Sequence, residues 1–161
     1  MILLTVTAAI ILLYTLNCIS YVFQKGSLLR RHVWDLNICC GATDGGGVNA
    51  DVVRHANVRN FVLIEDINRL PFVDNVFAST LCSHTMEHVE NPRAFSAELE
   101  RVSRNVVYLV PPLWDVGAVL NVLEHKWIFL TLRTEHRTLP PHVRLPFAAL
   151  VQNYLGQTIK A

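Results

Sequence analysis

The sequence predicts an α/β domain, with a mostly parallel sheet covered by helices on both faces, behind one N-terminal transmembrane helix. An uncharged apolar segment fills residues 1–24. Short apolar runs follow it without polar alternation, as in strands that are buried on both faces of a parallel sheet. An amphipathic helical segment stands between two of these runs, which is the spacing of α/β units.

Composition and charge exclude several classes of protein. The chain has 161 residues, of which 52% are hydrophobic and 17% charged, which fits one folded domain and excludes intrinsic disorder. The net charge of +1 gives no broad basic surface, so we expect no nucleic-acid partner. Charge is uneven, because residues 35–123 carry eleven acids and six bases while both ends are basic. We therefore expect the chemistry in the acidic middle.

The first 24 residues are interpreted as a membrane anchor. No charged side chain occurs between Met1 and Gln24, and a helix of that length crosses a core of about 30 Å at roughly 1.5 Å per residue. A cleaved signal peptide is a second interpretation, but no basic residue precedes the apolar run and no small-residue cleavage site precedes Lys25. A buried core helix is a third, although the segment barely has a polar face.

The charges beside the anchor predict its orientation. Lys25, Arg30 and Arg31 follow the span and nothing basic precedes it, so the positive-inside rule places the C-terminal part in the cytoplasm. The cysteines show no evident disulfide framework, which agrees with that compartment. The predicted organisation is a single-pass membrane protein with an anchor at 1–24, a basic juxtamembrane linker at 25–33 and a folded domain at 34–161.

Apolar runs and chain breakers define the elements of that domain. A helix is predicted over 92–103, where Phe95, Leu99 and Val102 share a face and Pro92 suits the first turn. A glycine-rich turn fills 41–47. Strands are predicted over 33–40, 48–53, 60–65, 75–82 and 105–110.

The C-terminal part is apolar but contains no second span. Residues 116–132 are interrupted by charged and polar side chains at 124–126, and Pro140 and Pro141 break the chain. Residues 147–155 form an amphipathic helix that covers the sheet, or acts as a substrate lid or membrane contact beside nearby arginines.

Polar residues and glycines follow each predicted strand. In parallel sheets ligands bind outside the carboxyl ends of the strands, where glycines let the backbone approach a ligand and acids accept hydrogen bonds from ribose hydroxyls. The sequence therefore predicts a nucleoside-binding crevice. Its candidate residues lie in 41–47, at Asp51, at 66–67, in 83–88 and in 111–114.

Four motifs together resemble the class I S-adenosylmethionine-dependent methyltransferases of type 11. They are Leu36-Asn-Ile-Cys-Cys-Gly41, the D-x-x-x-L-P-F-x-D-x-x-F stretch at 66–77, the E-H-V-x-x-P stretch at 87–92 and E-L-x-R-V at 98–102. The resemblance covers residues 34–115. It implies a Rossmann-like fold, S-adenosylmethionine as cofactor, and methyl transfer to a small-molecule or lipid-like acceptor of unknown identity.

The resemblance also implies roles for residues that bind the cofactor. Gly41 passes beneath the methionine part of the cofactor, and Asp51 holds the ribose hydroxyls. Asp66 and the backbone of Ile67 meet the adenine edge. Ser83 lines the methyl end.

Two histidines are candidate catalytic residues. The sulfonium methyl group is already activated, so the enzyme mainly supplies proximity and in-line orientation. A base is needed where the acceptor must lose a proton, and histidine titrates near neutrality. His84 and His88 are the candidates, with Glu87 between them.

Two alternatives remain. Cys40-Gly41-Ala42 stands where the family has G-x-G, and the first crossover is short, which favours an inactive, membrane-tethered binding module. His84, Glu87 and His88 also form H-x-x-E-H, a zinc-hydrolase signature. A zinc site of this kind needs a third ligand further along the chain. Glu124 and Glu135 are the candidates there, but neither stands in a recognisable pattern, so no metal is predicted.

Overall fold

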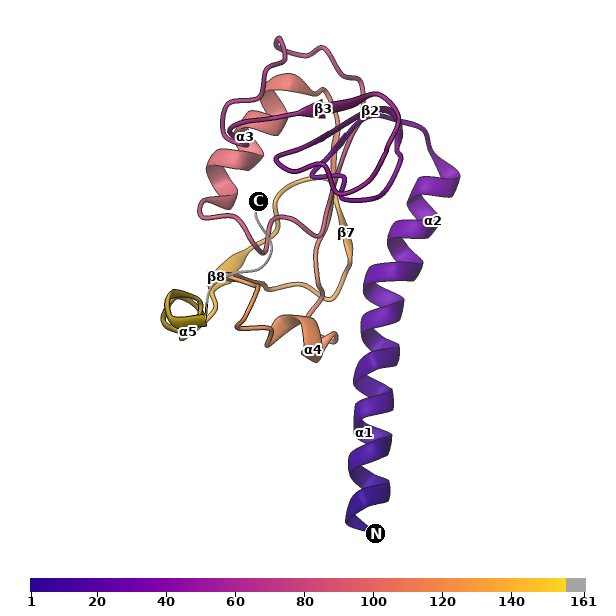
Figure 1. The fold of residues 1–161 in the computed structure, drawn as a ribbon, viewed down its shortest axis with the longest axis vertical. Helices are drawn as coiled ribbons and strands as arrows, with labels where there is room; N and C mark the ends of the chain where they lie inside the picture. Colours follow the sequence, from indigo (N-terminus) through magenta and orange to yellow (C-terminus); the bar gives the residue numbers. More distant parts are fainter. Residues whose placement is uncertain (156–161) are drawn as a thin grey trace.

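A mostly parallel sheet organises the domain (Figure 1). The computed structural model describes residues 1–155, and its six-stranded sheet has the order β3-β2-β1-β4-β5-β7. Neighbouring strands from β3 to β5 are parallel, and β7 is antiparallel to β5, which confirms the predicted α/β, Rossmann-like fold. The strands are β1 (Trp34–Ile38), β2 (Gly46–Asp51), β3 (Phe61–Leu63), β4 (Thr80–Ser83), β5 (Val106–Leu109) and β7 (Glu135–His136).

The strand order reverses between β1 and β4. β2 and β3 extend the sheet to one side of β1, and β4, β5 and β7 extend it to the other. The loops that leave β1 and β4 therefore diverge, and a crevice opens at the carboxyl ends of these two strands.

Helices cover the two faces of the sheet unequally. Helix α3 (Pro92–Val102) packs Phe95 and Leu99 into the main core against Leu36, Ile38 and Tyr108. On the opposite face a smaller cluster is covered by Leu28 and Leu29 of the N-terminal helix. That cluster consists of Trp34, Leu81, Val107 and Leu109.

The N-terminal helix runs without interruption into the domain. It consists of α1 (Ile2–Asn17), the π-helical segment η1 (Cys18–Phe23) and α2 (Gln24–Arg31). The first part projects beyond the domain and the last part lies beside it (Figure 1). Within residues 1–155, Leu3–Arg31 is the one helix long and apolar enough to cross a membrane, a test that a signal sequence also passes. The predicted boundary after Gln24 falls inside this helix.

The strand predicted over 75–82 is shorter than expected. Residues 75–79 lead to β4 as a loop, in which Ala78 and Ser79 donate backbone hydrogen bonds to the Asp35 carboxylate at 3.0 and 2.9 Å. Phe77 forms an isolated bridge with Ser103, and the Asn75 N–H donates to the Arg101 carbonyl at 2.8 Å. Phe77 is the one buried residue of 75–79, so the apolar residues of this run do not indicate a buried strand before Thr80.

The loop at 66–77 is clamped onto α3 by motif residues. Arg101 donates to Glu98 at 2.7 Å, to the Leu70 carbonyl at 3.2 Å and to Asp74 at 2.6 Å. Glu98 in turn accepts from the Leu70 backbone N–H at 2.7 Å. Two of the motifs that carry the family resemblance are thus structural partners.

The remaining elements lie at the end of the domain from which α1 projects (Figure 1). Strands β6 (Trp127–Phe129) and β8 (His142–Arg144) form a separate antiparallel pair. Helix α4 (Val116–Val119) contacts α1, and α5 (Ala148–Leu155) ends the described chain. The last six residues of the predicted domain 34–161 lie outside the described residues.

A buried asparagine pair stabilises the short connection between β1 and β2. Parallel strands normally need a crossover of about a dozen residues or more, whereas residues 39–45 make this one. Asn37 donates to Asn49 at 3.1 Å, and Asn49 accepts from the Gly45 N–H at 2.9 Å and donates to the Arg59 carbonyl at 2.8 Å. A side chain at Gly45 would lie 2.6 Å from the Asn37 Cβ. The turn and the two amides therefore form one closely packed unit.

Asn49→Ala is expected to lower the free energy of unfolding by about 2–3 kcal/mol, because it leaves the Gly45 N–H and the Arg59 carbonyl unpaired near a fully buried position and removes one hydrogen bond of Asn37. Urea unfolding followed by circular dichroism measures the change. Asn57→Ala, in the exposed loop that follows β2, is the control and should stay within about 0.5 kcal/mol. An Asn49 variant as stable as that control would contradict the role of the pair.

Candidate functional site

A cleft of about 570 Å³ lies where the loops after β1, β2 and β4 meet the N-terminal helix. Ligand pockets in proteins commonly measure about 300–1,000 Å³, so the cleft has room for a nucleoside-sized ligand. It is lined by Asn17, Ser20, Tyr21, Lys25, Cys39, Gly41, Ala42, Asp51, His55, Ser83, His84, Thr85, Glu87, His88, Pro111, Asp115, Gly117, Ala118, Asn121 and His125.

The strands on both sides of the crevice end in left-handed backbone. Cys39 after β1 has a φ of 49° and His84 after β4 has a φ of 52°. For residues other than glycine this conformation costs about 1–3 kcal/mol and is concentrated at binding and catalytic sites. Gly41 also has a positive φ of 57°, and a Cβ there would meet nothing within 4 Å. The Gly41 backbone is therefore open on one side.

Asp51 connects the end of β2 to the loop after β1. Its carboxylate accepts from the Gly41 N–H at 2.8 Å and from the Val52 N–H at 2.8 Å. The side chain is 4% exposed and lines the cleft. Asp51 thus fixes the position of Gly41 and presents negative charge to a ligand.

The predicted site residues divide into two groups. Gly41, Asp51, Ser83, His84 and His88 are brought together and all line the cleft. The two residues predicted for the adenine edge do not line it: Asp66 is exposed and accepts from the Asn68 N–H at 2.8 Å within a local turn, and Ile67 is buried in the main core. The functional roles of all seven stay predictions.

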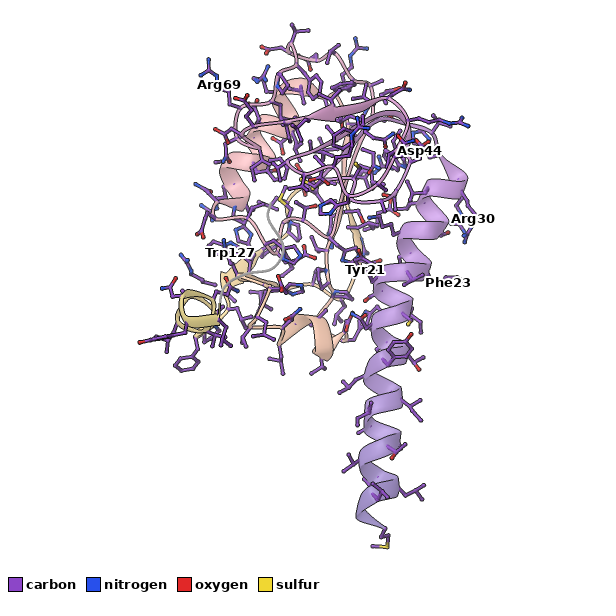
Figure 2. All side chains as sticks on the ribbon, in the orientation of Figure 1. Tyr21, Phe23, Arg30, Asp44, Arg69 and Trp127 are labelled. Carbon is purple, nitrogen blue, oxygen red and sulfur yellow. The ribbon has the colours of Figure 1, made fainter. Side chains whose placement is uncertain are left out.

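The N-terminal helix forms one wall of the cleft. The Tyr21 ring lies 4.5 Å from the His84 ring, centroid to centroid, and Ser20 donates to the Asp115 carboxylate. Lys25 is only 9% exposed, and its ammonium group lies 5.8 Å from the Tyr21 ring centre. Figure 2 shows Tyr21 on the side of the helix toward the domain and Phe23 on the side away from it.

This wall was not predicted from the sequence, although a signal for it existed. Asn17, Ser20, Tyr21 and Lys25 recur at intervals of one, three and four residues, which places them on one side of a helix. The segment also becomes π-helical there, a local widening that is frequent at functional sites.

A buried carboxylate stands at the centre of the cleft. Glu87 is completely buried, and its Oε1 lies 3.4 Å from Nδ1 of His84. Within residues 1–155 neither carboxylate oxygen accepts a hydrogen bond of good geometry. Burial raises the pKa of Glu87, but the His84 contact and the charges of His88 and His125 outweigh it and lower that pKa to about 2. Burial lowers the pKa of His125, against the opposite effect of the Glu87 charge.

Hydrogen bonds bring His125 to this carboxylate from a distant part of the chain. The Lys126 N–H donates to the Glu87 carbonyl at 2.6 Å, and the Trp127 indole donates to the Val89 carbonyl at 2.9 Å. Nδ1 of His88 lies 3.0 Å from the Glu124 carbonyl and donates to it. As a result the rings of His88 and His125 stand 4.8 Å apart. No sequence pattern indicated this pairing.

Comparison with known proteins identifies the type of domain. Residues 32–110 match a family model described as a methyltransferase domain. Among solved structures, a match is the crystal structure of a SAM-dependent methyltransferase from Aquifex aeolicus, with 16% sequence identity and a TM-score of 0.43. That match covers 58% of this chain and 66% of the other chain. A search of curated proteins found no match.

Proposed function

Because the chain belongs to the class I S-adenosylmethionine-dependent methyltransferases, we propose that it transfers the methyl group of this cofactor to an acceptor in the cleft. The observation that carries the proposal is the position of Asp51 at the carboxyl end of β2, beside the open backbone of Gly41. Ribose hydroxyls donate to a carboxylate in that position in nucleotide-binding sheets. The cofactor supplies an activated methyl group on a sulfonium ion when it is bound.

The residues that line the cleft suit such a ligand. Asp51 offers acceptors for the ribose, and the Gly41 loop allows close backbone approach. The Ser83 hydroxyl is buried without a hydrogen-bond partner in the described chain, so it has a free donor at the end of β4. These groups hold and orient a nucleoside, which is most of what methyl transfer requires of a protein.

His84 is the better placed of the two predicted bases. Its Nδ1 faces the Glu87 carboxylate at 3.4 Å, and its Nε2 is buried without a partner among residues 1–155. A carboxylate on one ring nitrogen orients the imidazole and supports protonation at the other nitrogen. In this arrangement Nε2 of His84 takes the proton that a hydroxyl or amine acceptor loses. The role of His88 is considered separately below.

Calorimetric titration of S-adenosylmethionine and S-adenosylhomocysteine into the full chain in detergent tests the proposal. Asp51→Ala is expected to weaken both ligands at least about tenfold, because a buried charge-assisted contact is lost. Asp66→Ala is the matched control, since Asp66 lies outside the cleft lining, and should change affinity less than about threefold.

The outcomes separate the alternatives. An equal loss in the Asp66 variant would support the adenine-edge role that the resemblance implies for Asp66. A folded wild-type chain that binds neither ligand would rule out the enzyme and leave an inactive, membrane-tethered module.

The proposal also includes the location of the protein at a membrane and the chemical class of the acceptor. Residues 1–16 are apolar on all sides, with Leu3 80% and Ile10 61% exposed, which suits lipid contact. Helices α4 and α5 carry exposed apolar side chains. Both helices lie at the end of the domain from which α1 projects (Figure 1). Since α4 residues also line the cleft, the proposed acceptor is lipid-like and reaches the cleft from the cytoplasmic membrane surface. The positive charges after the span support that orientation.

The membrane contact is tested on a chain that lacks residues 1–16, so that the apolar helix does not dominate binding. In this chain, the double substitution Phe147→Ser and Leu150→Ser should weaken binding to anionic vesicles by about tenfold or more, because two exposed apolar side chains are lost. Vesicle co-sedimentation measures the binding. Val73→Ser, an exposed apolar residue on the loop before β4, is the control. Loss of binding in the control as well, or in neither variant, would contradict a membrane contact through α5.

A further inference from the structure

The cleft contains a second site that methyl transfer itself does not require. Glu87, His88 and His125 are all buried, and one ligand atom of each lies within 4.8 Å of the others. We propose that these three residues bind a divalent transition-metal cation of the zinc class, with an open coordination position that faces the cleft. This site goes beyond the proposed methyl transfer, in which the methyl group is activated by its own sulfonium ion.

Two of the three groups have buried polar atoms without a hydrogen bond. Neither oxygen of Glu87 accepts one, although Nδ1 of His84 lies 3.4 Å from Oε1, and Nδ1 of His125 has no hydrogen-bond partner within the part of the chain that the structure describes. Buried polar groups are satisfied in the great majority of cases, so several unsatisfied atoms in one place need an explanation. A cation bound between the carboxylate and the two imidazoles satisfies them together.

The surroundings of His88 match the outer shell of a metal site. A histidine ligand almost always donates its other ring N–H to a carbonyl or carboxylate, which fixes the tautomer. His88 does this through Nδ1, at 3.0 Å from the Glu124 carbonyl, and this leaves the lone pair of Nε2 for a cation. The backbone bonds from Lys126 and Trp127 to the Glu87 carbonyl hold the two contributing segments together.

The donor set selects the type of cation. Two imidazoles and one carboxylate make up a common catalytic zinc set, in which the fourth position is left for water or substrate. Magnesium and calcium prefer sites made of oxygen ligands and fit this cluster poorly. Tetrahedral zinc ligands lie about 3.3 Å apart, given bonds of roughly 2.0–2.1 Å. The ligand atoms lie up to 4.8 Å apart, so a contraction of the cluster by up to about 1.5 Å has to accompany binding.

These ligands differ from those of the H-x-x-E-H signature. In that signature His84 and His88 bind the metal and Glu87 acts as the base. Here His84 instead faces Oε1 of Glu87, and the additional ligand is His125, next to the Glu124 that the sequence offered as a candidate. The cluster opens into the same cleft as Ser83 and Asp51.

Metal binding by the full chain in detergent, stripped with a chelator, tests the proposal. Zn²⁺ is titrated by calorimetry, and Co²⁺ is followed by its visible absorption, which is intense for tetrahedral coordination. We expect one ion per chain with a Kd of about 1 μM or tighter. Glu87→Gln and His125→Gln should each weaken binding more than about 100-fold, since even outer-shell partners are worth about 10–100-fold. His55→Ala, which removes an exposed histidine of the cleft outside the cluster, should leave binding unchanged.

The outcomes are independent of the methyltransferase proposal. A wild-type chain that takes up no ion, or variants at Glu87 and His125 that bind as tightly as wild type, would overturn the site. If one variant fails to fold, the other variant and the rise in the Tm of the wild-type chain on addition of Zn²⁺ still test whether the site binds metal. S-adenosylmethionine titration of the same samples without metal reports separately on the cofactor site.

Discussion

Deletion of residues 1–31 is expected to abolish cooperative folding of the domain. The cluster of Trp34, Leu81, Val107 and Leu109 covers one face of the central strands, and its helical cover consists of Leu28 and Leu29. Exposure of four such side chains costs roughly 6–12 kcal/mol at about 1.5–3 kcal/mol each, comparable with the typical total stability of about 5–15 kcal/mol. The helix that begins as the predicted anchor is therefore part of the fold over α2, where the sequence predicted a juxtamembrane linker.

The matched control is deletion of residues 1–16. Most of this segment projects beyond the domain (Figure 1), and Leu3, Ile10 and Tyr14 are 80%, 61% and 70% exposed. The shorter deletion should retain the urea midpoint of the full chain in the same detergent, as measured by circular dichroism and by the indole fluorescence of Trp34, which is 3% exposed. A chain without residues 1–31 that unfolds cooperatively at that same midpoint would show that the helix is only an anchor.

The strands were predictable because strands buried on both faces of a sheet consist mainly of apolar and small residues. Residues 81–83 and 106–109 are covered on both faces, and each is a continuous apolar or small-residue run. The start of α3 was predicted from Pro92, and the structure adds a cap, since the Asn91 side chain accepts from the Ala94 N–H at 3.1 Å. The loop at 75–79 was misassigned because its run of apolar residues resembles a strand, although Phe77 alone is buried.

The site was predictable only where its residues follow strands. Asp51 and Ser83 are the last residues of β2 and β4, and Gly41 and His84 lie in the loops after β1 and β4. The topology alone brings these strand ends together. His125 reaches the cleft through hydrogen bonds between loops far apart in the sequence, and the interactions that hold it leave no periodic signal. Lys25 was assigned to a linker because charge after an apolar span usually indicates orientation, and burial of a lysine is rare without partners.

Lys25→Met is expected to weaken binding of S-adenosylmethionine by about 10–100-fold, because a charge-assisted hydrogen bond to a buried group contributes roughly 1.5–3 kcal/mol. The cofactor carries a carboxylate on its methionine part, so a cleft that binds it needs a cation there. Among the described residues that line the cleft, Lys25 is the one lysine or arginine. Its ammonium group lies 5.8 Å from the centre of the Tyr21 ring, which also lines the cleft.

A ligand that lacks the carboxylate makes the test specific. Decarboxylated S-adenosylmethionine should bind the Lys25→Met variant about as tightly as it binds wild type, whereas the intact cofactor should not. Arg30→Met removes an exposed cation from the same helix and is expected to change neither affinity. An equal loss for both ligands would mean that Lys25 shapes the cleft without contacting the carboxylate. Loss of affinity for the intact cofactor alone would instead make the docked helix part of the cofactor site. Release of the helix from the domain would then also release the cofactor.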